Sequence, residues 1–330
     1  MPAQTPQRWQ HVAWTLSGIL LAAICLYYAL RGVDVHELGQ TLAEARPWLI
    51  VLSCVLSTAT LLMRAVRWQV LLNSEGNVRF RTVFWATAAG YFGNNFLPAR
   101  AGELVRTLLV TWSSRLDGAY VLATALAERV TDAIVLVLIA SAVLMLFPGH
   151  SGWLAGAARP FAIAGVCGAL VVAILPLTGT LPHRMVCTIP MPASLQPRVV
   201  RAVDAAIRGL RAFHSVSRLA SFLGLTGIIW TVDALTAAVS ASAIGLHLPL
   251  PIAFLLLSAL GVASALPSTP GYVGIFQFVS VMVLSPFGFS RAEAISLAVV
   301  LQAASYAVNG VWGSIGLARY RREAKTHPGA

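Results

Sequence analysis

The sequence predicts an all-α, polytopic integral membrane protein. Of its 330 residues, 58% are hydrophobic and 11% are charged, whereas a soluble domain typically carries about 25% charged residues. The hydrophobic residues also fall into long blocks with few or no ionisable groups, and a bilayer-spanning helix needs about 20 mainly apolar residues. These two observations predict one transmembrane domain, residues 1–330, with about six full spans at 11–30, 47–64, 118–147, 161–180, 219–246 and 293–318.

The first two blocks predict ordinary membrane helices. Residues 11–30 have no convincing small-residue cleavage site, so we expect a retained helix and not a removed signal peptide. The second helix begins at Pro47, because the fixed φ angle and missing N–H of proline suit a first turn. At its end, Arg64, Arg67 and Trp68 are expected at the cytoplasmic interface, where arginine side chains snorkel toward water. Recruitment of a lipid headgroup is the alternative role for the two arginines.

The charges between the blocks predict the topology. The formal charge is +11, and cytoplasmic loops carry an excess of Lys and Arg. The basic sites, together with both termini, are therefore expected on the cytoplasmic side of the inner membrane. Nucleic-acid binding is not expected, because the aromatic and basic platforms that it needs have no soluble domain to occupy. The basic sites lie at 64–81, 115, 181–218 and 319–325.

Two segments must begin and end on the same side of the membrane under this topology. They are residues 82–115 on the cytoplasmic side and 250–287 on the other. Each is a pair of short apolar pieces around a break that contains Pro and Gly. A helix of about 16 residues is about 24 Å long, which is shorter than the hydrocarbon core of about 30 Å. We therefore expect two re-entrant or tightly paired half-helix hairpins that enter from opposite faces.

The two breaks share the pattern LPxxxG. The copies begin at Leu97 and Leu266, 169 residues apart, which is about half the chain. With their flanking helices they predict an inverted-topology repeat, with units at about 47–147 and 219–318. In transporters, Gly/Pro-interrupted segments at corresponding positions of two halves indicate the substrate site. The alternative is a chance match of three residues. The expected break residues are Pro98, Gly102, Pro267, Pro270, Gly271 and Gly274.

Six charged residues occur just past the first break and inside the block 118–147. Each costs about 2.5–3.5 kcal/mol at the bilayer centre, so they must pair with one another or face a wet cavity. One interpretation is a site for an anionic headgroup, because the arginine fork suits phosphate. The other is a buried ion-pair network that fixes helix register. The six are Arg100, Glu103, Arg106, Glu128, Arg129 and Asp132, and the nearby polar candidates for the same site are Asn95, Ser268, Thr269 and Gln277.

Three further features complete the pattern. Residues 197–214 place four arginines on one helical face, which predicts an amphipathic helix on an anionic cytoplasmic leaflet; an ordinary basic loop is the alternative. Asp233 is alone in its block and should face protein. The four cysteines form no CxxC pair, so neither a metal site nor a disulfide framework is indicated, and we expect no cofactor.

Four motifs in order resemble the lysylphosphatidylglycerol synthase transmembrane family, which includes the flippase portion of MprF-type proteins. They are RxxRW at 64–68, FLPARAGELVR at 96–106, ERVTD at 128–132 and PSTPGYVGIFQ at 267–277. The resemblance covers about residues 11–320 and implies movement of an anionic or isoprenoid-type lipid between leaflets. Because the chain ends at Ala330, we expect no aminoacyl-transferase domain and no lysyl transfer.

The first functional hypothesis is therefore a lipid flippase or transporter that is not an enzyme and whose substrate is a membrane lipid. No P-loop pattern occurs, so ATP hydrolysis by this chain is not expected. The second hypothesis is a membrane enzyme acting on lipid phosphate, although the sequence shows no HExxH motif. The third is a non-transporting partner of a lipid-modifying enzyme or glycosyltransferase, with residues 197–214 as its docking surface.

Overall fold

The computed structural model describes residues 20, 23–31, 33, 35–96, 101–146, 152–174, 196–264 and 270–326. All regular secondary structure in these ranges is helical. Four of the described helices are long and apolar enough to cross a membrane, which confirms the all-α membrane class. They are α3 (Pro47–Leu72), α6 (Gly118–Leu146), α10 (Val216–Ala243) and α13 (Arg291–Thr326).

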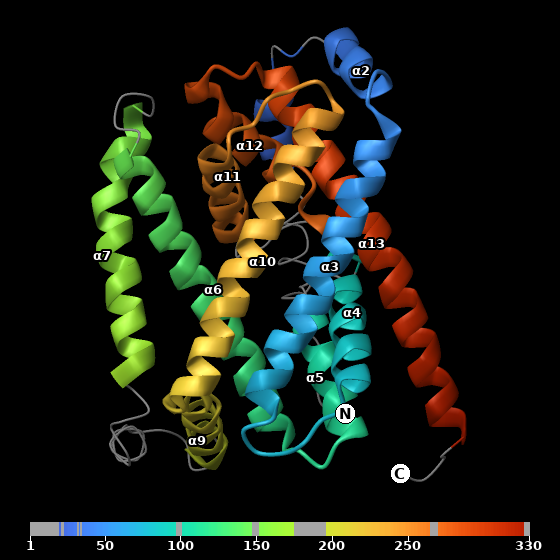
Figure 1. The fold of residues 1–330 in the computed structure, drawn as a ribbon, viewed down its shortest axis with the longest axis vertical. Coiled ribbons are helices and arrows are strands. Elements are labelled where there is room, and N and C mark those ends of the chain that lie inside the picture. The colour runs from blue at the N-terminus through green and yellow to red at the C-terminus, as the bar shows by residue number, and fades with distance from the viewer. Residues whose placement is uncertain are drawn as a thin grey trace, which may run out of the picture.

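The other two expected spans are described only in part. The block 11–30 lies mostly outside the described residues, although 23–30 are helical and lead to the short helix α2 (Val35–Ala43). The block 161–180 contributes to α7 (Gly152–Ile174), and residues 175–180 lie outside the described ranges. Helix α7 packs along α6 at one side of the bundle (Figure 1).

Helices α3 and α10 run antiparallel through the middle of the bundle (Figure 1). Along their contact, the residue numbers rise on α3 as they fall on α10. The amide of Arg46 donates to the carbonyl of Ala243 at 2.7 Å, Ser53 meets Ser240 at 3.0 Å, and Arg64 meets Asp233. Helix α3 also continues eight residues beyond its expected end at 64, to Leu72. This extension carries Arg67 and Trp68 into the protein interior instead of to an interface.

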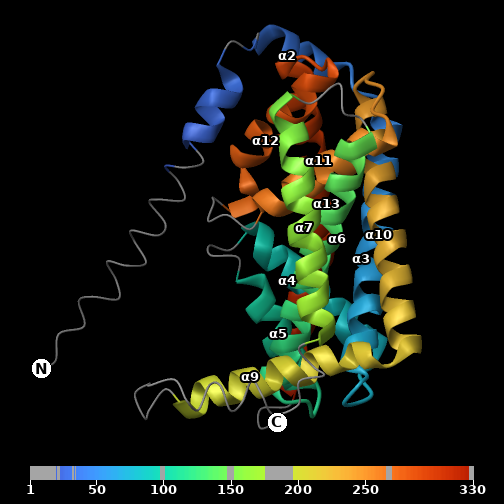
Figure 2. The same ribbon diagram turned by 90° about the vertical axis from the view of Figure 1, so that its left-hand side faces the viewer.

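Two pairs of short helices lie at opposite ends of the bundle. Helices α4 (Phe80–Phe96) and α5 (Gly102–Ser113) pack together in the half that contains α9, whereas α11 (Leu250–Ala263) and α12 (Ile275–Leu284) pack together in the half near α2 (Figures 1 and 2). Helix α4 also lies on α13, and α11 lies on α6. The tips of both pairs therefore meet near the middle of the molecule.

Each short pair is held by its own hydrophobic core. The core around α11 and α12 includes Leu256, Leu284 and Ile295, which are at most 2% exposed. The core around α4 and α5 includes Trp68 and Tyr120, which are fully buried. Burial of a large apolar side chain contributes about 1.5–3 kcal/mol, so these cores fix each pair against the long helices.

The glycine of each LPxxxG copy occupies a position where a side chain would collide with a neighbouring atom. A Cβ atom on Gly102 would lie 1.9 Å from the carbonyl oxygen of Gly90 on α4, and one on Gly271 would lie 1.7 Å from the Tyr306 hydroxyl oxygen. Gly271 also has φ +71°, a left-handed conformation that glycine adopts readily. Both short pairs therefore need glycine where the chain re-enters a helix.

The other break residues are described only in part. Pro98 and Pro267 lie outside the described residues. Pro270 opens the short 3-10 helix η4 (Pro270–Tyr272). Gly274, with φ +88°, caps the start of α12, and its amide donates to the Gln277 side chain at 2.7 Å. The second break therefore ends in two left-handed glycines.

Helix α9 (Gln196–Arg211) crosses one end of the bundle (Figure 2). It is followed by the 3-10 helix η3 (Ala212–His214), so the helical segment spans nearly the expected residues 197–214. Ala205 and Ile207 are buried against the bundle, and Arg208 donates to Asp117 at 2.8 Å. The apolar face of α9 is thus packed on the protein.

Candidate functional site

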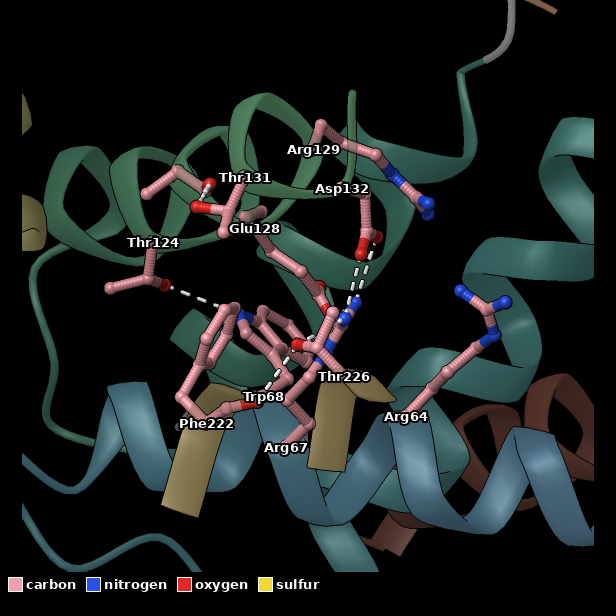
Figure 3. Close-up of polar contacts among 12 residues, drawn as sticks. Arg64, Arg67, Trp68, Thr124, Glu128, Arg129, Thr131, Asp132, Phe222 and Thr226 are labelled. Atoms are coloured by element: carbon pink, nitrogen blue, oxygen red, sulfur yellow. Dashed lines mark hydrogen bonds and ion pairs between the residues drawn. The ribbon is translucent and has the colours of Figure 1, made fainter. Parts of the chain in front are cut away.

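A buried charge network joins α3, α5, α6 and α10 below the middle of the bundle. Its centre is Arg67, whose side chain is fully buried. Arg67 donates to Glu128 at 2.7 and 3.1 Å, to Asp132 at 2.6 and 2.8 Å, and to the Thr226 hydroxyl at 3.0 Å (Figure 3). The bidentate geometry toward Asp132 gives the strongest kind of arginine–carboxylate contact.

Arg106 brings α5 into the same network. Its Nη1 donates to Oε2 of Glu128 at 2.9 Å, while the other Glu128 oxygen accepts from Arg67. Arg106 also pairs with Glu103, and its guanidinium lies 4.5 Å from the Trp68 ring centroid. Glu128 is therefore held on both sides by cations in the protein interior.

Such a network fixes how the helices sit against one another. Removing one partner of a buried ion pair typically costs 3–5 kcal/mol, because a charge is left without compensation. Arg67, Arg106 and Glu128 are each at most 2% exposed. Of the two interpretations of the charged segment, a register-fixing network suits these three residues.

Above this network lies a cavity of about 310 Å³. Its lining comes from α3, α4, α6, α10, α11, α12 and α13, together with Gly271 and Tyr272 at the second break. It therefore lies between the tips of the two short pairs. The charged lining residues are Arg64, Arg129 and Asp233.

The two arginines of the cavity share one aromatic neighbour. The guanidinium carbons of Arg64 and Arg129 lie 5.8 and 5.4 Å from the centroid of the Tyr91 ring. Figure 3 shows both guanidinium groups pointing away from the Arg67 network toward the same region. Arg64 pairs with Asp233 and lies 5.2 Å from the Trp230 ring centroid. Arg129 pairs with Glu103 at 2.7 Å, and its side chain is 31% exposed.

One side-chain donor in the cavity wall lacks a partner among the described residues. The Nδ2 atom of Asn95 is buried without a hydrogen bond, and Asn95 lines the cavity. Its neighbour Asn94 accepts from the amide of Gly102 at 3.1 Å and so caps α5. An unpaired buried donor costs about 1–3 kcal/mol, which favours a ligand or water at this position.

The second break presents a satisfied polar cluster to the same cavity. Gln302 donates to the carbonyl of Gly271 at 2.9 Å, and the Tyr306 hydroxyl donates to that same carbonyl at 2.6 Å. Gln277 donates to Gln302 and is 5% exposed. These contacts satisfy the backbone of an interrupted helix, as the interior of a membrane protein requires.

The sequence-predicted site residues thus separate into three groups. Arg129, Asn95 and Gly271 line the cavity. Glu103 supports Arg129, whereas Arg106, Glu128, Asp132 and Gln277 lie in buried contacts outside the lining. Outside the described residues lie Arg100, Ser268 and Thr269.

The interfacial prediction for the end of the second helix is wrong for Arg67 and Trp68, which are both fully buried. The physical reason is that carboxylates from α6 compensate Arg67 inside the bundle. Arg64 lines the cavity, so it has the position that the alternative role, recruitment of a lipid headgroup, requires. Sequence reasoning missed the cavity roles of Asp233, Tyr91 and Trp230. Only Asp233 gave a signal, as an isolated acid in an apolar block.

No group of three or more His, Cys, Asp or Glu side chains within the described residues could hold a metal ion. The cavity instead offers cationic, amide and aromatic groups, which can bind an anionic or phosphate-bearing ligand.

Comparison with known proteins relates the chain to a protein family and to a curated relative. The model of the lysylphosphatidylglycerol synthase transmembrane region matches residues 15–313. A protein of Haloferax volcanii named "Glycosyltransferase AglD" is 26% identical over 341 aligned residues. That alignment covers 90% of this chain and 53% of the relative, so the chain spans about half the length of the curated relative that it matches.

Proposed function

The chain belongs to the lysylphosphatidylglycerol synthase transmembrane family, and on this premise we propose that it moves a lipid between the leaflets of the membrane. The substrate is an anionic phospholipid or an isoprenoid-type lipid. Its headgroup passes through the central cavity while its chains stay in the surrounding bilayer. The chain itself performs no chemical step.

The observation that carries this proposal is the position of two arginines between the tips of the short helix pairs. Arg64 and Arg129 both line the cavity and flank Tyr91. Charged groups are costly at membrane depth and mark substrate pathways. A pair of guanidinium groups in this cavity supports recognition of a phosphate-bearing headgroup.

The arrangement of the halves supports an inverted-topology repeat. The unit 47–147 contains α3, α4, α5 and α6, and the unit 219–318 contains most of α10 and α13 together with α11 and α12. Helix α3 opposes α10, and the two short pairs occupy opposite ends (Figure 1). In transporters with such repeats, rocking of one unit against the other exposes a central site to each side in turn. We place the hairpin α4–α5 on the cytoplasmic side of the inner membrane, with α9 and both termini.

A second function is favoured by the name of the relative. The Haloferax volcanii protein is named as a glycosyltransferase and is nearly twice as long as the aligned region. This supports an alternative in which the chain serves as a non-transporting membrane partner of a glycosyltransferase or other lipid-modifying enzyme. The basic face of helix α9 would be the docking surface. Co-purification of such an enzyme that is lost on deletion of α9, in a protein without transport activity, would favour this alternative.

Leaflet exchange in proteoliposomes tests the first function. A panel of head-labelled lipids is reconstituted with the full chain, and dithionite quenching measures the fraction that reaches the outer leaflet. We expect exchange of one lipid class and a loss of at least tenfold in rate for Arg129→Ala. Arg208→Ala is the matched control. Arg208 lies on α9, pairs with Asp117 and does not line the cavity.

The control should keep the wild-type rate. Equal rates for wild type and a folded Arg129→Ala protein would reject the cavity as the headgroup path. The absence of exchange for every lipid tested, with and without a proton gradient, would reject transport and leave the partner role.

A further inference from the structure

Arg64 and Asp233 occupy corresponding positions of the two proposed repeats. They are 169 residues apart, which is the offset between the two LPxxxG copies. The same offset separates the first residues of α3 and α10, Pro47 and Val216. The ion pair therefore links equivalent turns of the two antiparallel helices, and both of its members line the central cavity.

Of the four carboxylates in the described ion pairs around the cavity, Asp233 has the fewest arginine contacts. Glu128 is held by Arg67 and Arg106, Glu103 by Arg106 and Arg129. Asp132 receives both terminal nitrogens of Arg67. Asp233 receives one nitrogen of Arg64, and the two side chains are 18% and 12% exposed. The cavity can therefore compete for this contact more readily than for the others.

The charges of the described cluster balance. Its four arginines, Arg64, Arg67, Arg106 and Arg129, meet four carboxylates, Glu103, Glu128, Asp132 and Asp233. An anion that enters this cluster adds an uncompensated negative charge at low dielectric, which is costly. The cost falls if the anion takes over the arginine contact of a carboxylate that can turn toward water in the cavity, as Asp233, 18% exposed and in the cavity lining, is placed to do. The arginine fork accepts carboxylate and phosphate with similar geometry, so Asp233 resembles a built-in substitute for a phosphate.

We propose that a phosphate group binds between Arg64 and Arg129 by displacing Asp233 from Arg64. This inference rests on the proposed function and names the chemical group that the cavity recognises. The unpartnered Nδ2 donor of Asn95, which is 8% exposed and lines the same cavity, supplies a further hydrogen bond to the phosphate. In the empty protein the carboxylate of Asp233 neutralises Arg64, and in the loaded protein the phosphate does.

The exchange links headgroup binding to the two halves of the molecule. With the cavity empty, the Arg64–Asp233 pair ties the middle of α3 to the middle of α10. With phosphate bound, that tie is broken while Arg64 stays neutralised. Binding therefore loosens the contact between the repeat units only when a substrate of the correct charge is present. This provides a physical basis for selectivity toward phosphate-bearing lipids.

Binding of a short-chain lipid to the purified full chain tests the exchange. Dioctanoyl phosphatidic acid is titrated calorimetrically, and dioctanoylglycerol, which has the same chains without phosphate, is the ligand control. Because Asp233→Asn removes the competing charge next to the site, we expect it to tighten binding of the phosphatidic acid at least tenfold. Arg64→Gln should weaken binding at least tenfold. Asp117→Asn, which removes the carboxylate of the exposed pair with Arg208, should leave the affinity unchanged.

Unchanged or weaker binding by a folded Asp233→Asn protein would overturn the proposal, as would equal binding of dioctanoylglycerol. Asp233→Ser is the second variant if Asn does not fold. Failure of both to fold would also contradict the exchange, because a pair that the ligand displaces must be dispensable for folding. The outcome is separable from the transport assay. Phosphate-dependent binding without leaflet exchange rejects transport alone, and exchange of lipid without any effect of Asp233 rejects this inference alone.

Discussion

Replacement of Arg67 by methionine should destabilise the protein more than any single change at an exposed ion pair. Arg67 is fully buried and donates five hydrogen bonds, four of them to carboxylates. Methionine fills a similar volume, so the loss is electrostatic. Glu128 would keep Arg106, but among the described residues Asp132 would keep only the hydrogen bond of 3.4 Å from Trp230. We expect a loss of about 3–5 kcal/mol, the usual cost of leaving a buried charge without its partner.

Neutralising the stranded acid should recover part of this loss. In Arg67→Met/Asp132→Asn, the uncompensated charge is removed, and we expect the double variant to be about 1–3 kcal/mol more stable than Arg67→Met. The assay is reversible unfolding in mixed micelles with increasing SDS, followed by tryptophan fluorescence. Arg208→Met is the matched control: its ion pair is 41% and 54% exposed, and such pairs contribute at most about 1 kcal/mol.

Two results would refute the reasoning. A loss for Arg67→Met as small as that of the Arg208 control would mean that water or another cation compensates Asp132. A double variant no more stable than Arg67→Met would mean that the cost lies in packing and not in the buried charge.

The two break glycines give further predictions in the same unfolding assay. Gly102→Ala should cost about 1–3 kcal/mol, because its Cβ would lie 1.9 Å from a backbone oxygen of α4 and overpacking forces the backbone to shift. Gly227→Ala, in open space on α10, should be neutral or slightly stabilising, and equal losses at the two sites would contradict the steric argument. Gly271→Ala should cost more than Gly288→Ala: both have positive φ angles, but only Gly271 also meets the Tyr306 hydroxyl. A difference below about 1 kcal/mol between these two would assign the whole effect to backbone strain.

The helices could be predicted from the sequence because hydrophobic blocks determine which segments cross a bilayer. The block expected at 219–246 forms α10 at Val216–Ala243, and the break around Gly102 separates two short helices. The glycine pattern was visible because LPxxxG occurs twice in the sequence, and a Cβ atom at Gly102 or Gly271 would overlap a neighbouring oxygen atom. The hydrophobic blocks and the Pro/Gly pattern were sufficient to predict these features.

The charged site could be predicted only in part, because its partners come together through tertiary packing. Arg67 looked like an interfacial anchor, since a charge at the end of an apolar block usually reaches water. Its counter-charges Glu128 and Asp132 lie 61 and 65 residues away, and nothing in the local pattern connects them. Tyr91 and Trp230 gave no signal either, because an aromatic residue in an apolar block is ordinary.

The two proposed repeat units share an offset of 169 residues but not a charge pattern, and the proposed exchange depends on this difference. Equivalent helices begin 169 residues apart at Pro47 and Val216, yet position 64 is arginine and position 233 is aspartate. A repeat that placed the same charge at both positions would set like charges against each other where α3 meets α10. Opposite charges instead hold α3 to α10 beside the cavity, and under the proposed exchange they separate when an anion replaces the carboxylate. The difference at this one pair of positions therefore supplies both the ion pair between α3 and α10 and the arginine that a phosphate can take over.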